Sequence, residues 1–187
     1  MQHTISVLVE NHFGVLARVA GLFSARGFNI DSLAVGETQD SQVSRMTVIA
    51  QGDDRIVEQI MKQLNKLVDV ICVEDLTGKD IIERELVLIK IGANATNRND
   101  IMHVVNTFRA KIVDVNPESM TIEVTGSEGK IDAMLELLRP FNLREVVRTG
   151  QIAMARRNVI KSPCKAGGKA KGGRGPKPAA AKKNKKK

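Results

Sequence analysis

The chain opens on an apolar residue at every second position, in the run TISVLVE. This period of two predicts a strand over Thr4–Glu10 with one buried face. After Gly14 the spacing changes to i, i+3, i+4 and i+7, which predicts a helix over Val15–Arg26 that ends at Gly27. The apolar positions of this helix are Leu16, Val19, Ala20 and Phe23.

The rest of the first half continues the alternation between strand and helix patterns. The expected elements are strands at Asn29–Gly36 and Val43–Gln51, a helix at Asp54–Lys66 and a strand at Val68–Glu74. The resulting order, βαββαβ, is the ferredoxin-like arrangement. In such a unit both helices lie on one face of an antiparallel sheet, so we expect another part of the chain or a partner to cover the other face.

The second half repeats this order after an expected linker at Leu76–Glu83. Its elements are strands at Glu85–Ile91, Lys111–Asn116, Ser119–Thr125 and Leu143–Thr149, with helices at Asp100–Phe108 and Ser127–Leu138. We therefore predict the α+β class, with two tandem ferredoxin-like βαββαβ domains at residues 3–76 and 84–157.

The positive charge of the chain is confined to its end. The 187 residues include 29 Lys and Arg against 21 Asp and Glu, a net charge of +8. Residues 158–187 hold eleven of the basic residues and no acidic one, so residues 1–157 are mildly acidic. This Lys-, Gly-, Ala- and Pro-rich tail is predicted to be disordered. It acts either as a solubilising extension or as a salt-dependent binder of nucleic acid or another polyanion.

The loop between the first strand and the first helix carries the clearest candidate chemistry. Asn11 and Gly14 lie in it, directly before a helix N-terminus, where unpaired N–H groups and the positive dipole end suit a carboxylate. A second asparagine, Asn29, begins the next strand, and asparagine carbonyls accept hydrogen bonds from ammonium groups. These groups together suit a small zwitterion such as an amino acid. The alternative is structural, with Gly14 permitting a tight turn and Asn11 capping the helix.

Several segments of the chain, spread over both halves, resemble one family. They are VLVENHFGVLARVAGLFSARGFNIDSL, SRMTV, QIMKQLNKLVDVICVEDL, RELVLIKI and FRAKIVDV. The first resembles the start of an ACT domain, and all of them in order resemble the regulatory (small) subunit of acetolactate synthase. The resemblance covers about residues 3–157. It implies an N-terminal ACT domain that dimerises side by side and binds branched-chain amino acids, chiefly valine, between subunits.

Carried over residue by residue, the resemblance places one wall of the valine site at the first loop and the other on a neighbouring subunit. The first wall is Asn11, Gly14, Val15 and Leu16, and the second is Asn29 and Ile30. Backbone N–H groups at Gly14–Leu16 take the carboxylate, the two asparagine amides meet the ammonium group, and Leu16 and Ile30 enclose the branched side chain. Arg45, on a predicted strand, is either a solvated charge or a contact to the catalytic subunit.

The implied function is regulatory. The chain activates the catalytic subunit of acetolactate synthase and transmits feedback inhibition by valine, without being an enzyme on its own. Thiamin diphosphate, magnesium and FAD are expected on the catalytic subunit, because this chain lacks a diphosphate-binding loop. No metal is expected here, since His3, His12 and His103 have no His or Cys partner at ligand spacing.

Two other functions remain open, an ACT-type sensor of some other enzyme and a polyanion binder acting through the basic tail. The two are separable by the protein captured as partner and by deletion of the tail. The N-terminus has no basic and apolar leader, and no apolar run is long enough to span a membrane, so we expect a cytoplasmic protein.

Overall fold

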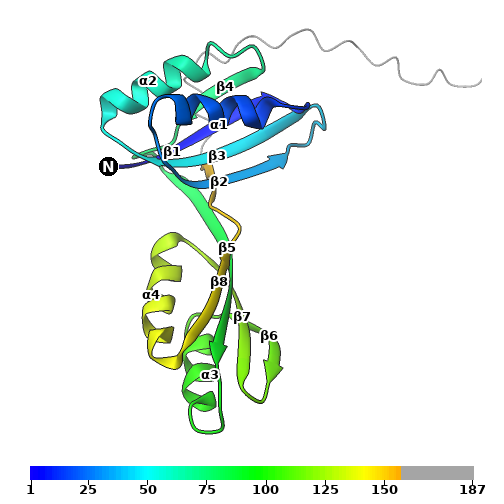
Figure 1. Ribbon diagram of the computed structural model, residues 1–187, viewed down its shortest axis with the longest axis vertical. Coiled ribbons are helices and arrows are strands. Elements are labelled where there is room, and N and C mark those ends of the chain that lie inside the picture. The colour runs from blue at the N-terminus through cyan, green and yellow to red at the C-terminus, as the bar shows by residue number, and fades with distance from the viewer. Residues whose placement is uncertain (157–187) are drawn as a thin grey trace, which may run out of the picture.

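The computed structural model describes residues 1–156, and the prediction of a disordered tail at residues 158–187 lies outside the described residues. Two α+β units follow one another along the long axis of the molecule (Figure 1). The predicted fold class is confirmed, because each unit has the order βαββαβ and an antiparallel sheet. None of the helices within residues 1–156 is long and apolar enough to cross a membrane.

The N-terminal unit is a four-stranded sheet with two helices on one face (Figure 1). Its elements are β1 (Gln2–Glu10), α1 (Val15–Ala25), β2 (Ile30–Glu37), β3 (Val43–Gln51), α2 (Asp54–Leu64) and β4 (Val70–Asp75). The strands lie in the order β2-β3-β1-β4, and every neighbouring pair is antiparallel. The order leaves β2 at the edge of the sheet.

The alternation in β1 explains how this unit packs. Ile5, Val7 and Val9 point to the helices and are fully buried, and Phe23 of α1 is fully buried against them. Burying one such side chain contributes about 1.5–3 kcal/mol. Helix α2 begins at a conventional cap, where the Asp53 side chain accepts a hydrogen bond from the Ile56 N–H at 2.8 Å.

The C-terminal unit has the same layers. Its elements are β5 (Ile81–Gly92), α3 (Arg98–Thr107), β6 (Lys111–Asn116), β7 (Ser119–Gly126), α4 (Glu128–Leu138), the short 3-10 helix η1 (Arg139–Phe141), β8 (Leu143–Arg148) and β9 (Ile152–Ala155). The main sheet has the order β6-β7-β5-β8, and β9 pairs with β5 outside this sheet. Pro140 lies in η1, directly after α4. Because proline has no N–H group to continue the hydrogen bonds of the helix, α4 ends before it.

The expected linker is wrong at its last three residues. Strand β5 begins at Ile81, and its first four residues pair with β9, a strand that the sequence did not predict. This ribbon of Ile81–Arg84 and Ile152–Ala155 lies against the face of the N-terminal sheet that the helices leave open (Figure 1). Ala153 of β9 and Thr47 of that face are both buried. An antiparallel sheet whose second face is apolar needs another part of the chain to cover that face. Strands of four residues can do this, but they are too short to leave a clear pattern in the sequence.

Candidate functional site

The N-terminus of α1 is open toward solvent. Gly14 precedes the helix with φ 85° and ψ −8°, a left-handed conformation that favours glycine, and a Cβ there would meet nothing within 4 Å. Within residues 1–156 no side chain caps this helix, and its first turn contains no acidic residue. The first N–H groups of the helix and the positive end of its dipole are therefore available to a carboxylate.

The side chain of Asn11 has a fixed orientation. Its Nδ2 donates hydrogen bonds to Glu37 Oε1 at 3.1 Å and to the backbone oxygen of Ser41 at 2.9 Å. Both partners accept hydrogen bonds, so the nitrogen of the amide must face them. The amide oxygen is on the opposite side of this group from the two acceptors. It is therefore able to accept a hydrogen bond from an ammonium group.

The two apolar residues that follow Gly14 lie in different surroundings. Val15 is 3% exposed and belongs to the core, so only its backbone N–H can contact a ligand. Leu16 is 44% exposed and presents its side chain at the surface. Of the predicted first wall, the structure therefore offers the Asn11 amide, the N–H groups of Gly14–Leu16 and the Leu16 side chain.

The predicted second wall lies at the other end of the same sheet. Ile30 begins β2 and pairs with Ala50 of β3, whereas the Asn11 N–H donates to the oxygen of Gln42 just before β3. The eight residue-to-residue steps from Gln42 to Ala50 span roughly 26 Å at 3.3 Å per step. Asn29, whose Nδ2 donates to Asp31 Oδ1 at 2.8 Å, lies beside Ile30. A single chain therefore does not bring the two walls together.

Arg45 lies on the sheet face opposite the helices. Its Nη1 donates to Ser6 Oγ at 2.9 Å, and the residue is one side of a groove of about 310 Å³ between the sheet and the β5–β9 ribbon. The exposed apolar residues of this groove are Val35, Ile82, Ile152 and Met154. Arg45 is therefore an exposed cation with one hydrogen bond to the sheet, and it lies beside an apolar surface.

The structure also shows an ionic cluster that the sequence did not reveal. His12 Nε2 lies 3.1 Å from Asp69 Oδ1 and 3.4 Å from Glu10 Oε2, and Arg18 pairs with the other oxygen of Asp69. The three ligand-type atoms of Glu10, His12 and Asp69 lie within 4.8 Å of one another. Arg18 supplies a positive charge to this group, so ion pairing accounts for the arrangement. The partner Asp69 is 57 residues from His12, which hides the cluster from an inspection of spacing.

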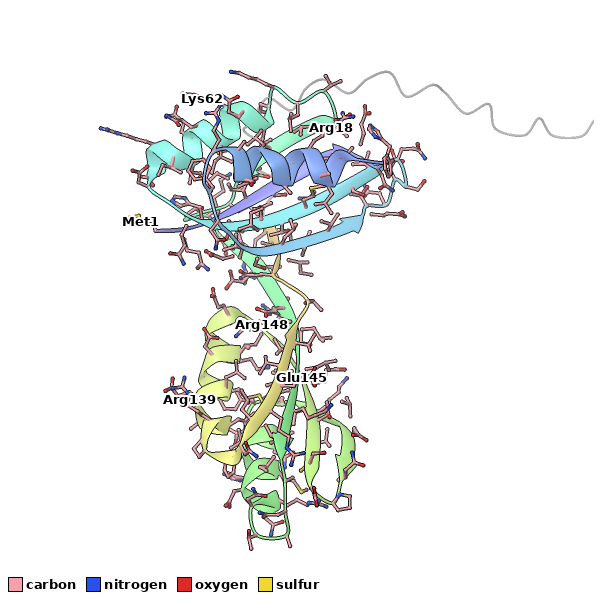
Figure 2. The ribbon with its side chains drawn as sticks, in the orientation of Figure 1. Met1, Arg18, Lys62, Arg139, Glu145 and Arg148 are labelled. Atoms are coloured by element: carbon pink, nitrogen blue, oxygen red, sulfur yellow. The ribbon has the colours of Figure 1, made fainter. Side chains whose placement is uncertain are left out.

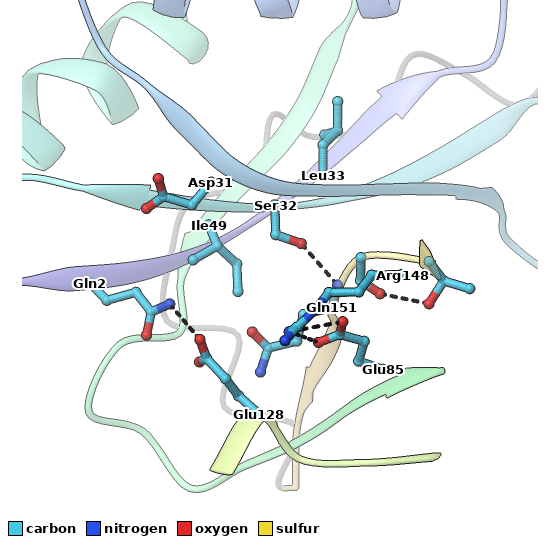
Figure 3. Close-up of a pocket in the computed structure, with 11 residues that line it drawn as sticks. Gln2, Asp31, Ser32, Leu33, Ile49, Glu85, Glu128, Arg148 and Gln151 are labelled. Atoms are coloured by element: carbon cyan, nitrogen blue, oxygen red, sulfur yellow. Dashed lines mark hydrogen bonds and ion pairs between the residues drawn. The ribbon is translucent and has the colours of Figure 1, made fainter. Parts of the chain in front are cut away.

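A polar cavity of about 300 Å³ lies between the two units (Figure 3). Glu85 lines it and is only 6% exposed, with its charge paired to Arg148 at 3.3 Å. Arg148, at the end of β8 near the junction (Figure 2), also pairs with Asp132 of α4 at 3.1 Å. No motif in the sequence indicated this cavity, because its residues come from six separate elements and the turn between β8 and β9.

In comparisons with known proteins, each of the two units matches a known family. Residues 5–72 match the family described as the AHAS small subunit-like ACT domain, and residues 84–157 match the family described as the small subunit of acetolactate synthase. The fold of the N-terminal unit is thus that of an ACT domain.

Relatives match over most of their length. The probable acetolactate synthase small subunit of Archaeoglobus fulgidus is 53% identical over 158 residues, which cover 84% of this chain and 99% of the relative. That of Methanothermobacter thermautotrophicus is 54% identical over 155 residues, which cover 82% and 92%. The crystal structure of the acetolactate synthase small subunit from Thermotoga maritima superposes with a TM-score of 0.77 at 42% identity, covering 85% of this chain and 99% of that one. This chain belongs to the family of acetolactate synthase small subunits.

Proposed function

We propose that the chain is the non-catalytic regulatory subunit of an acetolactate synthase complex, located in the cytoplasm. It binds the catalytic large subunit, raises its activity and makes it sensitive to valine. Family membership supports the role in the complex and disfavours a free-standing sensor of another enzyme. The observation that carries the effector role is the uncapped N-terminus of α1, preceded by Asn11, whose amide nitrogen is held by Glu37 and Ser41.

Valine fits the groups that the loop presents. Its carboxylate accepts hydrogen bonds from the N–H groups of Gly14–Leu16, where the helix dipole favours a negative charge. Its ammonium group donates to the amide oxygens of Asn11 and of Asn29 from the other subunit. The branched side chain lies between Leu16 and Ile30. The carboxylate and ammonium groups of valine match the backbone dipoles and asparagine amides that the proposal assigns to them.

A dimer formed through β2 joins the two walls. Strand β2 is the edge of its sheet, and Val35 on it is 46% exposed. A two-fold axis pairs two copies of β2 antiparallel, so that the end carrying Asn29 approaches the end of the partner that carries Glu37 and Asn11. Because the two walls lie at opposite ends of one sheet, this pairing brings them together twice in each dimer.

Regulation in this proposal requires unequal binding. Thiamin diphosphate, magnesium and FAD are held by the catalytic subunit, which performs the condensation. Valine inhibits only as far as it binds the less active state of the complex more tightly than the active state.

The first experiment is a calorimetric titration of L-valine into the full chain, with D-valine and L-lysine as controls. We expect stereospecific binding at one valine per chain, which corresponds to two sites per dimer. The same titration is repeated on the complex reconstituted with the catalytic subunit. Absence of binding in both preparations would refute the effector role.

Arg45→Ala tests the contact with the catalytic subunit. We expect the variant to require about five- to thirty-fold more protein for half-maximal activation, the effect of losing 1–2 kcal/mol at an interface arginine. Valine binding to the isolated chain should be unchanged. Arg55→Ala is the matched control, because Arg55 is an exposed arginine of α2 on the helix side of the sheet. Normal activation by Arg45→Ala would remove the proposed contact.

A further inference from the structure

We propose that Ser32 and Gly150 form a contact, here called the joint, that transmits a structural change in the N-terminal (ACT) sheet to the C-terminal unit. The inference rests on the proposed function, because it concerns how the same valine site is coupled to the rest of the chain. The joint consists of Ser32 and Leu33 on β2 and the turn Thr149–Gln151 between β8 and β9 (Figure 3).

One side of the turn is fixed to the C-terminal unit. The Thr149 N–H donates to the Leu86 oxygen at 3.1 Å, and the Leu86 N–H donates to Thr149 Oγ1 at 3.2 Å. The preceding residue, Arg148, pairs with Glu85 and Asp132. Because Glu85 is buried, this pairing holds the end of β8 firmly against β5 and α4.

The other side of the turn is fixed to the ACT unit. The Gln151 N–H donates to Ser32 Oγ at 3.0 Å, a hydrogen bond between residues 119 positions apart. Gly150 has φ 84°, and a Cβ on it would lie 2.9 Å from the Leu33 oxygen. Only glycine therefore allows the turn to approach the β2 backbone this closely. Within three residues, the chain passes from a contact with one unit to a contact with the other.

Along β2, Ser32 of the joint follows two residues after Ile30, which belongs to the second wall of the proposed valine site. The register of β2 against β3 shifts between Ile30 and Ser32, so Asp31 is an extra residue in the strand. Such a bulge changes the local twist and direction of a strand. A valine molecule that moves Asn29 or Ile30 consequently changes the position of Ser32, and with it the turn that Ser32 holds.

The surroundings of the joint allow the two units to move against each other. The cavity of about 300 Å³ beside Ser32 has the volume of roughly ten water molecules. Across it, the Gln2 side chain reaches Glu128 only at 3.5 Å. The contact across this cavity is small and polar, as in units that change their relative position, whereas the β5–β9 ribbon itself is packed on the open face of the N-terminal sheet.

The test uses the complex reconstituted with the catalytic subunit. Valine binding is measured by calorimetry, and inhibition is measured as the ratio of activity without valine to activity at saturating valine. For Ser32→Ala we expect valine affinity within about twofold of the wild type but an inhibition ratio reduced about fivefold, the effect of losing one hydrogen bond. Ser32→Thr keeps a hydroxyl acceptor on the strand and should restore the ratio.

Gly150→Ala should reduce the inhibition ratio in the same direction, because its Cβ forces the turn away from Leu33. Gly78→Ala is the matched control, since Gly78 also has a positive φ, 68°, but nothing lies within 4 Å of its Cβ. The control carries the same backbone strain without the collision and should leave regulation unchanged. Hydrogen exchange at the Gln151 N–H should change on valine binding in the wild type and no longer do so in Ser32→Ala.

Two failures are distinguishable. A wild-type complex that neither binds valine nor is inhibited by it overturns the proposed function and the joint together. A wild-type complex that is inhibited, with full inhibition retained in both Ser32→Ala and Gly150→Ala, overturns the joint alone. Equal loss of inhibition in Gly78→Ala and Gly150→Ala also overturns the joint, because strain in any turn would then produce the effect.

Discussion

Gly14→Asp should abolish binding of valine and inhibition by it while leaving the chain folded. The new carboxylate would stand at the N-terminus of α1, where the carboxylate of valine is proposed to bind. Two unit negative charges 4 Å apart repel by about 4 kcal/mol at an effective dielectric constant of 20, so we expect at least roughly 100-fold weaker binding. Calorimetry with L-valine measures this loss, and the inhibition of the reconstituted complex provides a second reading.

The structure indicates that this variant folds. Nothing lies within 4 Å of a Cβ at position 14, so the side chain has space. Aspartate tolerates a positive φ better than most residues, and its carboxylate can accept hydrogen bonds from the N–H groups of α1. Gly14→Asn is the matched control, because it has the same shape and backbone strain without the charge, and its valine affinity should fall less than tenfold. Wild-type inhibition in Gly14→Asp would refute the placement of the carboxylate.

The order of elements could be predicted because local patterns determine most of it. The alternation at Ile5, Val7 and Val9 corresponds to side chains that are buried in the structure, as do Val19 and Phe23 of the helical pattern, whereas Leu16 of that pattern is exposed. The same holds for Met120, Ile122 and Val124 in the second half. Strand β9 escaped prediction because four residues, Ile152–Ala155, provide too few positions to show an alternation, and its pairing with Ile81–Arg84 depends on contacts between distant parts of the chain.

The loop of the candidate site was visible in the sequence, but its geometry was not. Gly14 before a helical pattern indicates a turn with a positive φ, and this is what the structure contains. The direction of the Asn11 amide depends on Glu37 and Ser41, which are 26 and 30 residues away. The joint depends on a hydrogen bond over 119 residues, for which a single sequence gives no signal. Contacts of this kind become evident only once both units are folded.

A mixed dimer should recover the valine binding that two variants lack separately. We expect Asn11→Ala and Asn29→Ala to weaken valine binding about ten- to a hundred-fold each, because each removes an acceptor for a charged ammonium group. In a dimer of one Asn11→Ala chain and one Asn29→Ala chain, one site receives both altered residues and the other receives none. Calorimetry on the dimer purified through two different tags should therefore show wild-type affinity at one valine per dimer.

The reciprocal combination is the control for this experiment. A chain with both substitutions, paired with a wild-type chain, places one altered residue in each site, so the dimer should contain no intact site. If Asn11 and Asn29 of the same chain formed the site, the two results would be reversed. The roughly 26 Å between the two ends of β3 predicts the first outcome, because no single valine molecule can contact both asparagines of one chain. The two-fold dimer is then a requirement for effector recognition, and loss of dimerisation should remove valine binding even where each subunit remains folded.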